Sequence, residues 1–309
     1  MRVDSFKKLS WLTLVVTLAV IAWGAFVRAS GSGAGCGSHW PDCNGEIIPR
    51  PKSVATIIEF THRITSGLSL LLTVAQLFFA FRAFPARHPV RRAASASMFF
   101  MITEAGVGAG LVLFEMVAHN KSAARALWMS AHLINTFFLL ASMALTLYLA
   151  HDRPAPRLRG HGARGVLVSL AAVSLLAVGV AGAVVALGDT LFPSRSLAEG
   201  LTADVTPGAH FLVRLRVIHP AIAVVFGGAL FVFARLTAAR ESDHSVRALA
   251  TAVNLAFLVQ VGVGALNLGL LAPIPLQIVH LVVADLYWMT AVLFFAAVLA
   301  LPPPRLSGD

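Results

Sequence analysis

Residues 276–300 read LQIVHLVVADLYWMTAVLFFAAVLA, an apolar run that is interrupted only by Gln277, His280 and Asp285 among strongly polar side chains. A helix rises about 1.5 Å per residue, so this run can cross a bilayer core of about 30 Å. Working towards the N-terminus, the sequence contains seven more runs of this kind. The predicted spans cover residues 10–28, 55–82, 94–115, 125–150, 165–187, 209–234, 248–270 and 276–300. The sequence therefore predicts an all-α integral membrane protein with eight transmembrane helices.

The composition agrees with this class. Of the 309 residues, 58% are hydrophobic and only 12% are charged, too few to cover the surface of a soluble domain. A net charge of +10 could indicate a nucleic-acid partner. The basic residues instead lie in short loops between the spans, so membrane lipid is the expected partner and nucleic acid is not.

The distribution of basic residues predicts the orientation. They gather at the N-terminus, in every second loop and in the tail: Arg2, Lys7, Lys8, Arg82, Arg87, Arg91, Arg92, Arg153, Arg157, Arg159, Arg164, Arg235, Arg240, Arg247 and Arg305. The positive-inside rule then places both termini in the cytoplasm. Without a recognisable transit peptide, we expect a multi-pass protein of the bacterial inner (cytoplasmic) membrane. A cleaved signal peptide is the alternative for the first span, but that apolar run is long and Arg28 follows it.

The two halves of the chain resemble each other. Gly24-Ala25 in the first span matches Gly182-Ala183 in the fifth, and 104–110 (EAGVGAG) matches 260–266 (QVGVGAL) in the seventh. Matching order suggests duplication of a four-helix unit. We therefore predict two pseudo-symmetric four-helix bundles, 1–152 and 153–309.

Four histidines fall inside spans, one in each even-numbered span: His62, His132, His219 and His280. All four are expected at similar depth in the outer half of the membrane. Intramembrane ionisable residues are costly and usually functional, although a helix-to-helix hydrogen bond is the plain alternative for any one of them. Two histidines on two helices of a bundle can hold a haem through axial imidazoles. We pair His62 with His132 and His219 with His280.

The two predicted sites are unequal. Glu59 lies three residues before His62, on the same helix face, and Arg216 takes that place before His219. A carboxylate there can exchange protons, whereas an arginine can pair with a haem propionate. An ion pair of Glu59 with Arg63 or Arg28 is the alternative. The roles of Glu104 and Asp285, deep in their spans, stay open between proton relay and packing.

Residues 29–54 form a predicted external loop that contains both cysteines, Cys36 and Cys43. In an oxidising compartment the two thiols are expected to form a disulfide. The bond could be a structural staple or a redox-active pair. Metal binding by both thiols with His39 is a further alternative.

These motifs resemble the haem A synthase family of the bacterial type with a single external cysteine pair. The resemblance is carried by residues 28–45, by Glu59-x-x-His62-Arg63, and by 132–136 (HLINT), His219 and 280–281 (HL). It covers essentially the whole chain. The loop 188–208 contains no cysteine, although some members have a second pair there.

The resemblance implies an oxidoreductase that converts the C8 methyl group of haem O to a formyl group, via hydroxylation, and so makes haem A for terminal oxidases. It implies that His62 and His132 flank the substrate haem O in the N-terminal half and that Glu59 is the catalytic carboxylate. It further implies that His219 and His280 ligate the iron of a haem b in the C-terminal half. Arg28, Arg63 and Arg216 are expected to support these sites, as propionate partners.

Two other functions stay open at this stage: a di-haem b-type electron carrier and a haem transporter or chaperone. Candidate protein partners are haem O synthase, oxidase assembly factors and a second copy of the chain.

Overall fold

The computed structural model describes residues 3–50, 53–157 and 159–302, so Arg2 and Arg305 lie outside the described residues. The described chain is helical, with an isolated bridge between Cys43 and Glu46. The helices are α1 (Val3–Ala29), α2 (Val54–Ala83), α3 (Pro89–Leu113), α4 (Ala123–Ala150), α5 (Ala163–Leu191), α6 (Leu197–Val205), α7 (Phe211–Arg214), the 3₁₀ turn η1 (Leu215–Val217), α8 (Ile218–Arg240), α9 (His244–Gly269) and α10 (Ile274–Ala300).

Eight of the described helical segments are long and apolar enough to cross a membrane, with α7, η1 and α8 counted as one continuous span. The predicted number of spans is therefore confirmed. Most helices extend a few residues beyond the predicted runs because polar residues cap their ends, as Ser53 and Ser122 do by accepting hydrogen bonds from backbone N–H groups. The sequence did not predict the short α6, which lies in the loop before the sixth span.

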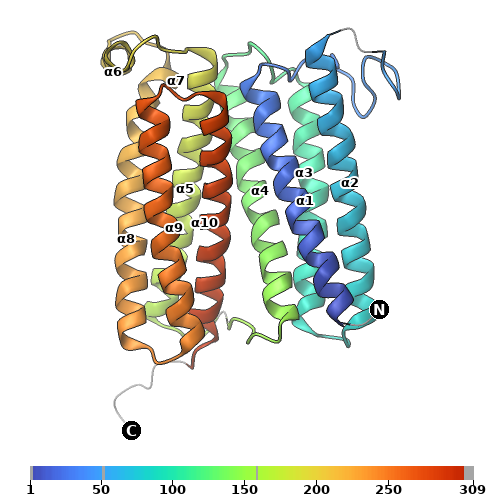
Figure 1. Cartoon of the computed structure of the whole chain (residues 1–309), viewed down its shortest axis with the longest axis vertical. Helices are drawn as coiled ribbons and strands as arrows, with labels where there is room; N and C mark the ends of the chain where they lie inside the picture. The colour runs from blue at the N-terminus through green and yellow to red at the C-terminus, as the bar shows by residue number, and fades with distance from the viewer. Residues whose placement is uncertain (1–2, 51–52, 158, 303–309) are drawn as a thin grey trace.

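Figure 1 shows α1–α4 side by side, with α5 and α8–α10 beside them. The start of α1 and the end of α10 lie at one end of the molecule, and the loop that contains the cysteines lies at the other end. This arrangement is the one that an even number of spans requires. It stays a prediction that the end with the start of α1 and the end of α10 faces the cytoplasm.

The centre of the molecule is formed by α4 and α10, the two spans of which more than half is buried. Trp288 of α10 stacks on Phe137 of α4, with ring centroids 5.2 Å apart, and its Nε1–H donates to the Phe137 carbonyl at 2.6 Å. Gly179 of α5 lets the same phenylalanine approach, because a Cβ there would lie 2.7 Å from its ring. The other spans expose large apolar side chains such as Leu71 and Leu255, as expected for a surface in contact with lipid.

A half-buried arginine also joins the two groups of spans. Arg28, in the last turn of α1, donates to the Ala186 carbonyl and to Thr190 Oγ1 of α5, both at 2.7 Å. Its other terminal nitrogen donates to Gln277 Oε1 of α10 at 3.0 Å. The guanidinium therefore binds groups of the protein, and we find a contact across the molecule where the sequence suggested support for a propionate.

Candidate functional site

The four intramembrane histidines occupy equivalent places in the fold. They lie on α2, α4, α8 and α10, each one to three helical turns from the start of its span. Each also faces a glycine of the preceding span. The facing pairs are Gly24 with His62, Gly108 with His132, Gly182 with His219, and Gly264 with His280.

These glycines leave room for the imidazole rings. A Cβ at Gly24 would lie 2.9 Å from His62 Cε1, and one at Gly182 or Gly264 would lie 3.0 Å from the corresponding atom of His219 or His280. At Gly108 the distance to His132 would be 3.9 Å, an ordinary contact. Small residues thus bring the helix backbone against three of the four rings.

The structure brings His219 and His280 together, with ring centroids 6.3 Å apart and ring planes at 88°. A metal ion lies about 2.0–2.1 Å from a ligating imidazole nitrogen, so two rings that share one ion must lie within several ångströms of each other. The observed separation therefore fits a metal held between these two rings. His219 Nδ1 is buried without a hydrogen-bond partner.

His62 and His132 are the second predicted pair. They lie on α2 and α4, and their pairing stays a prediction. The Nδ1 atoms of both histidines are buried and lack a hydrogen-bond partner. Unpartnered buried nitrogens are costly unless something binds the ring, so this pair also fits a ligand in the bundle.

Two further polar residues lie next to the histidines. Glu104 Oε1 lies 3.5 Å from His132 Nδ1, which is an ion-pair distance without the direction of a hydrogen bond. Gln260 Nε2 lies 3.3 Å from His280 Nδ1. From the sequence, the role of Glu104 stayed open, and Gln260 was only its matching position in the second half of the chain. The signal that could have found both contacts is the shared spacing of four residues to Gly108 and Gly264.

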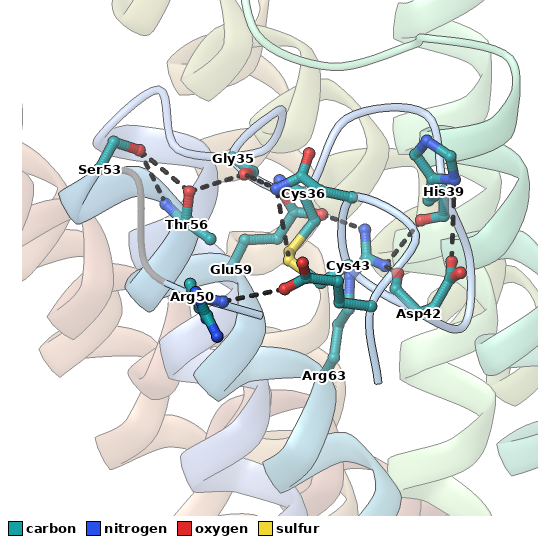
Figure 2. Close-up of a disulfide and its surroundings, with 12 residues drawn as sticks. Gly35, Cys36, His39, Asp42, Cys43, Arg50, Ser53, Thr56, Glu59 and Arg63 are labelled. Atoms are coloured by element: carbon teal, nitrogen blue, oxygen red, sulfur yellow. Dashed lines mark hydrogen bonds and ion pairs between the residues drawn. A yellow bond between two sulfur atoms is a disulfide. The ribbon is translucent and has the colours of Figure 1, made fainter. Parts of the chain in front are cut away.

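Glu59 is buried beneath the external loop, where Figure 2 shows it between Cys36 and Arg63. Its Oε2 accepts from the Cys36 backbone N–H at 2.9 Å, and its Oε1 accepts from Arg63 Nη2 at 2.5 Å. Arg63 also donates to the carbonyls of His39, at 2.7 Å, and Asp42. The ion pair with Arg63, considered from the sequence, is therefore present, and the two side chains hold the loop against α2.

Cys36 and Cys43 form the expected disulfide and are fully buried. Thr56, in the first turn of α2, donates to the Gly35 carbonyl at 2.8 Å (Figure 2). A Cβ at Gly35 would overlap the backbone of Ala55, so the loop can lie this close to α2 only with glycine there. The loop is thus a tightly held cap on the N-terminal spans.

Arg216 occupies the matching place before His219, and it also holds a cap. Its side chain pairs with Asp189 at 3.0 Å and with Asp204 of α6 at 3.8 Å, and donates to the carbonyls of Gly188 and Phe192. Burial raises the pKa of the Asp204 carboxyl, and Arg216 opposes that change. Glu59 and Arg216 therefore have the same structural role, which is to hold a capping segment against the spans, although their charges are opposite.

Within the described ranges, no group of three or more histidine, cysteine or acidic side chains is placed to hold a metal ion. Axial ligation of a haem needs two imidazoles, because the porphyrin supplies the other iron ligands. The two histidine pairs therefore match the donor set of a haem site.

The fold and these sites define a multi-pass helical membrane protein with one histidine in each of four spans, towards the end of the molecule where the disulfide loop and α6 lie. Residues 7–292 match the cytochrome oxidase assembly protein family, and the chain belongs to that family.

Relatives fall under two names. A Thermus thermophilus protein named protoheme IX farnesyltransferase is 47% identical over 292 residues, which are 94% of this chain and 48% of that protein. A heme A synthase of Exiguobacterium sp. is 34% identical over 161 residues, 50% of this chain and 52% of that protein. A heme A synthase of Symbiobacterium thermophilum is 38% identical over 109 residues, 35% of each chain. The matched region thus spans about half or less of each of these relatives.

Proposed function

We propose that this protein is a haem A synthase, which oxidises the C8 methyl group of haem O to a formyl group. The observation that carries the proposal is the presence of two histidine pairs with unequal neighbours. His62 and His132 have Glu59 and Glu104 close by, whereas His219 and His280 have Arg216 and Gln260. Two similar histidine pairs with different neighbouring side chains suit one haem that reacts and one haem that stays bound. The heme A synthase names of two relatives support this reading.

The conversion must balance in oxygen, protons and electrons. A methyl group and one net water give a formyl group, four protons and four electrons. Two successive hydroxylations with water-derived oxygen give a geminal diol, which then loses water. The electrons need an external acceptor of the class of membrane quinones or one-electron carriers. The protein's own residues must orient the substrate and accept protons.

In this proposal His62 and His132 flank haem O, and the Glu59 carboxylate takes protons from the reacting centre. Glu59 is buried and lies one turn from His62 on α2, so it is placed for that role. His219 and His280 hold a haem b, which supplies a redox relay when bound. The family and the eight spans support a site in the bacterial inner membrane.

A haem O synthase is the proposed partner. The Thermus relative has a name that states farnesyl transfer to protoheme IX, and this chain matches 48% of its length. We propose that this chain receives haem O from such an enzyme, whether separate or joined to it.

Pigment extraction tests the proposal and separates it from farnesyl transfer. Cells that lack haem A synthase receive this chain with or without a haem O synthase. We expect haem A only when both are present, and no conversion of protohaem by this chain alone. Haem O alone in the first strain would overturn the proposal if the chain is folded in the membrane. Haem O formed by this chain alone would favour a farnesyltransferase.

Single histidine variants divide the roles. His62→Ala and His132→Ala should abolish haem A while the purified protein keeps its resident haem. His219→Ala and His280→Ala should remove that haem. Equal haem loss in all four variants would contradict the assignment of substrate to one pair and cofactor to the other.

A further inference from the structure

Glu104 and Gln260 are matched residues that face one histidine in each half of the chain. Glu104 precedes Gly108 by four residues, and Gln260 precedes Gly264 by four. Those glycines face His132 and His280. The same position in the repeat therefore places a carboxylate beside the His132 ring and a neutral amide beside the His280 ring.

The Glu104 carboxylate is held in position by α4, the helix that carries His132. Its Oε2 accepts from Asn135 Nδ2 at 2.6 Å, and its Oε1 accepts from Thr136 Oγ1. Asn135 is itself fixed, because it accepts from Thr103 Oγ1 at 2.6 Å and donates to the Phe100 carbonyl at 2.8 Å. With these donors in place, Oε1 stays 3.5 Å from His132 Nδ1.

The amide of Gln260 lies over the edge of the other ring. Its Nε2 is 3.3 Å from His280 Nδ1 and 3.4 Å from His280 Nε2, and its Oε1 has no hydrogen-bond partner. Among the described side chains, no carboxylate lies within 4.0 Å of a His280 ring nitrogen, whereas Glu104 meets that distance at His132.

We propose that Glu104 is a positioning residue that acts through His132. With a haem held at Nε2, the Glu104 carboxylate, 3.5 Å from Nδ1, would accept a hydrogen bond from Nδ1–H and make the imidazole a more electron-rich ligand. This inference rests on the proposed function, because it takes His132 as a haem ligand. A carboxylate behind a ligating histidine fixes its tautomer and raises its basicity. Gln260 is a neutral amide and does not have this effect, so His280 would be the weaker ligand to iron.

The difference sets a direction for electrons. An electron-rich axial ligand stabilises ferric over ferrous iron, so a haem on His132 should have a lower midpoint potential than a haem on His280. Electrons released at the N-terminal site would then move towards the C-terminal site, where they are accepted more readily. Glu104 and Gln260 thereby give the two similar sites different redox tasks.

The test exchanges the two side chains in full-length protein. Ferric protohaem IX is bound to the N-terminal site in a His219→Ala/His280→Ala background, and to the C-terminal site in a His62→Ala/His132→Ala background. Glu104→Gln should raise the midpoint potential of the first, shift its electron paramagnetic resonance g values and weaken ferric haem binding about 10–100-fold. Gln260→Glu should lower the potential of the second. Glu115→Gln, at an exposed turn residue just after α3, is the control and should change neither.

Unchanged potentials and g values in both exchanges would overturn the inference. The reciprocal variant keeps the test decisive even if Glu104→Gln fails to fold, since Gln260→Glu alone must lower the C-terminal potential. Conversion of haem O is measured separately in the wild-type chain. Shifted potentials without any haem A would support the role of Glu104 as a ligand partner and overturn the proposed activity.

Discussion

The Glu59 carboxylate accepts a hydrogen bond from the Cys36 backbone N–H at 2.9 Å and so ties the disulfide loop to α2, one turn from His62. Arg63 completes the contact from the same helix, at 2.5 Å from the other carboxylate oxygen. The residue that the proposal makes catalytic is therefore also a structural link to the loop. A change of Glu59 to glutamine can separate the two roles. The amide oxygen can still accept the hydrogen bond from Cys36, but an amide cannot take up protons as a carboxylate does.

Glu59→Gln keeps an oxygen that can accept from Cys36, so the loop should stay closed and the disulfide protected. Glu59→Ala leaves Arg63 without its buried partner, which should cost about 3–5 kcal/mol. We expect both variants to lose haem A formation, and only Glu59→Ala to show faster reduction of the Cys36–Cys43 bond. Thiol labelling after a timed pulse of reductant measures the second effect.

Glu46 provides the control within the same loop. It is exposed, and its Oε2 accepts from the Arg50 backbone N–H at 3.1 Å. Glu46→Gln should change neither haem A formation nor the reduction rate. Full activity of Glu59→Gln would show that the carboxylate has only the structural role.

The glycines that face the histidines give a graded prediction. Gly24→Ala should displace the His62 ring, since the new Cβ would lie 2.9 Å from Cε1, whereas Gly108→Ala would place its Cβ 3.9 Å from His132 and should be tolerated. We expect a loss of about 10–100-fold in ferric haem affinity at the N-terminal site for the first variant and little change for the second. Gly67→Ala, which meets open space on α2, controls for the helix itself. Equal losses at Gly24 and Gly108 would contradict this geometry.

Arg28 should stabilise the association of the two groups of spans. Arg28→Gln removes a half-buried guanidinium that donates to three neutral acceptors, and should lower the stability by about 1–3 kcal/mol. Thr190→Val removes one of those contacts and should cost about 1 kcal/mol. Thermal unfolding in detergent measures both. With a protease site inserted between α4 and α5, the cleaved halves should separate readily in the Arg28 variant and co-purify in the wild type. Co-purification of equal strength would count against a clamp at Arg28.

The sequence predicted the eight spans well, because apolar runs leave a one-dimensional signal. Apolar runs mark the spans, and one histidine in each even span marks a shared depth. Contacts between helices depend on how each helix is rotated about its axis, which the sequence does not encode locally. For that reason Arg28 was expected beside a propionate and lies across the molecule, and the contact of Glu104 with His132 was not foreseen. The helix α6 is short and mostly polar in its neighbourhood, so the apolar pattern could not reveal it.

Asp285 gives the last prediction, because it is fully buried on α10 and neither of its carboxylate oxygens has a hydrogen-bond partner among the described residues. An unsatisfied buried polar group costs about 1–3 kcal/mol, and such a cost is usually retained for function. Asp285→Leu should therefore raise the free energy of unfolding by about that amount, whereas Asp285→Asn leaves an unsatisfied amide and should not, and both variants should lower haem A formation. Asp189→Asn is the opposite control, since Asp189 pairs with Arg216 at 3.0 Å and its loss should destabilise. Thermal unfolding in detergent and pigment extraction give the two readouts. Lower stability in both Asp285 variants would mean that the carboxylate has a partner, such as a buried water, and that its burial is structural.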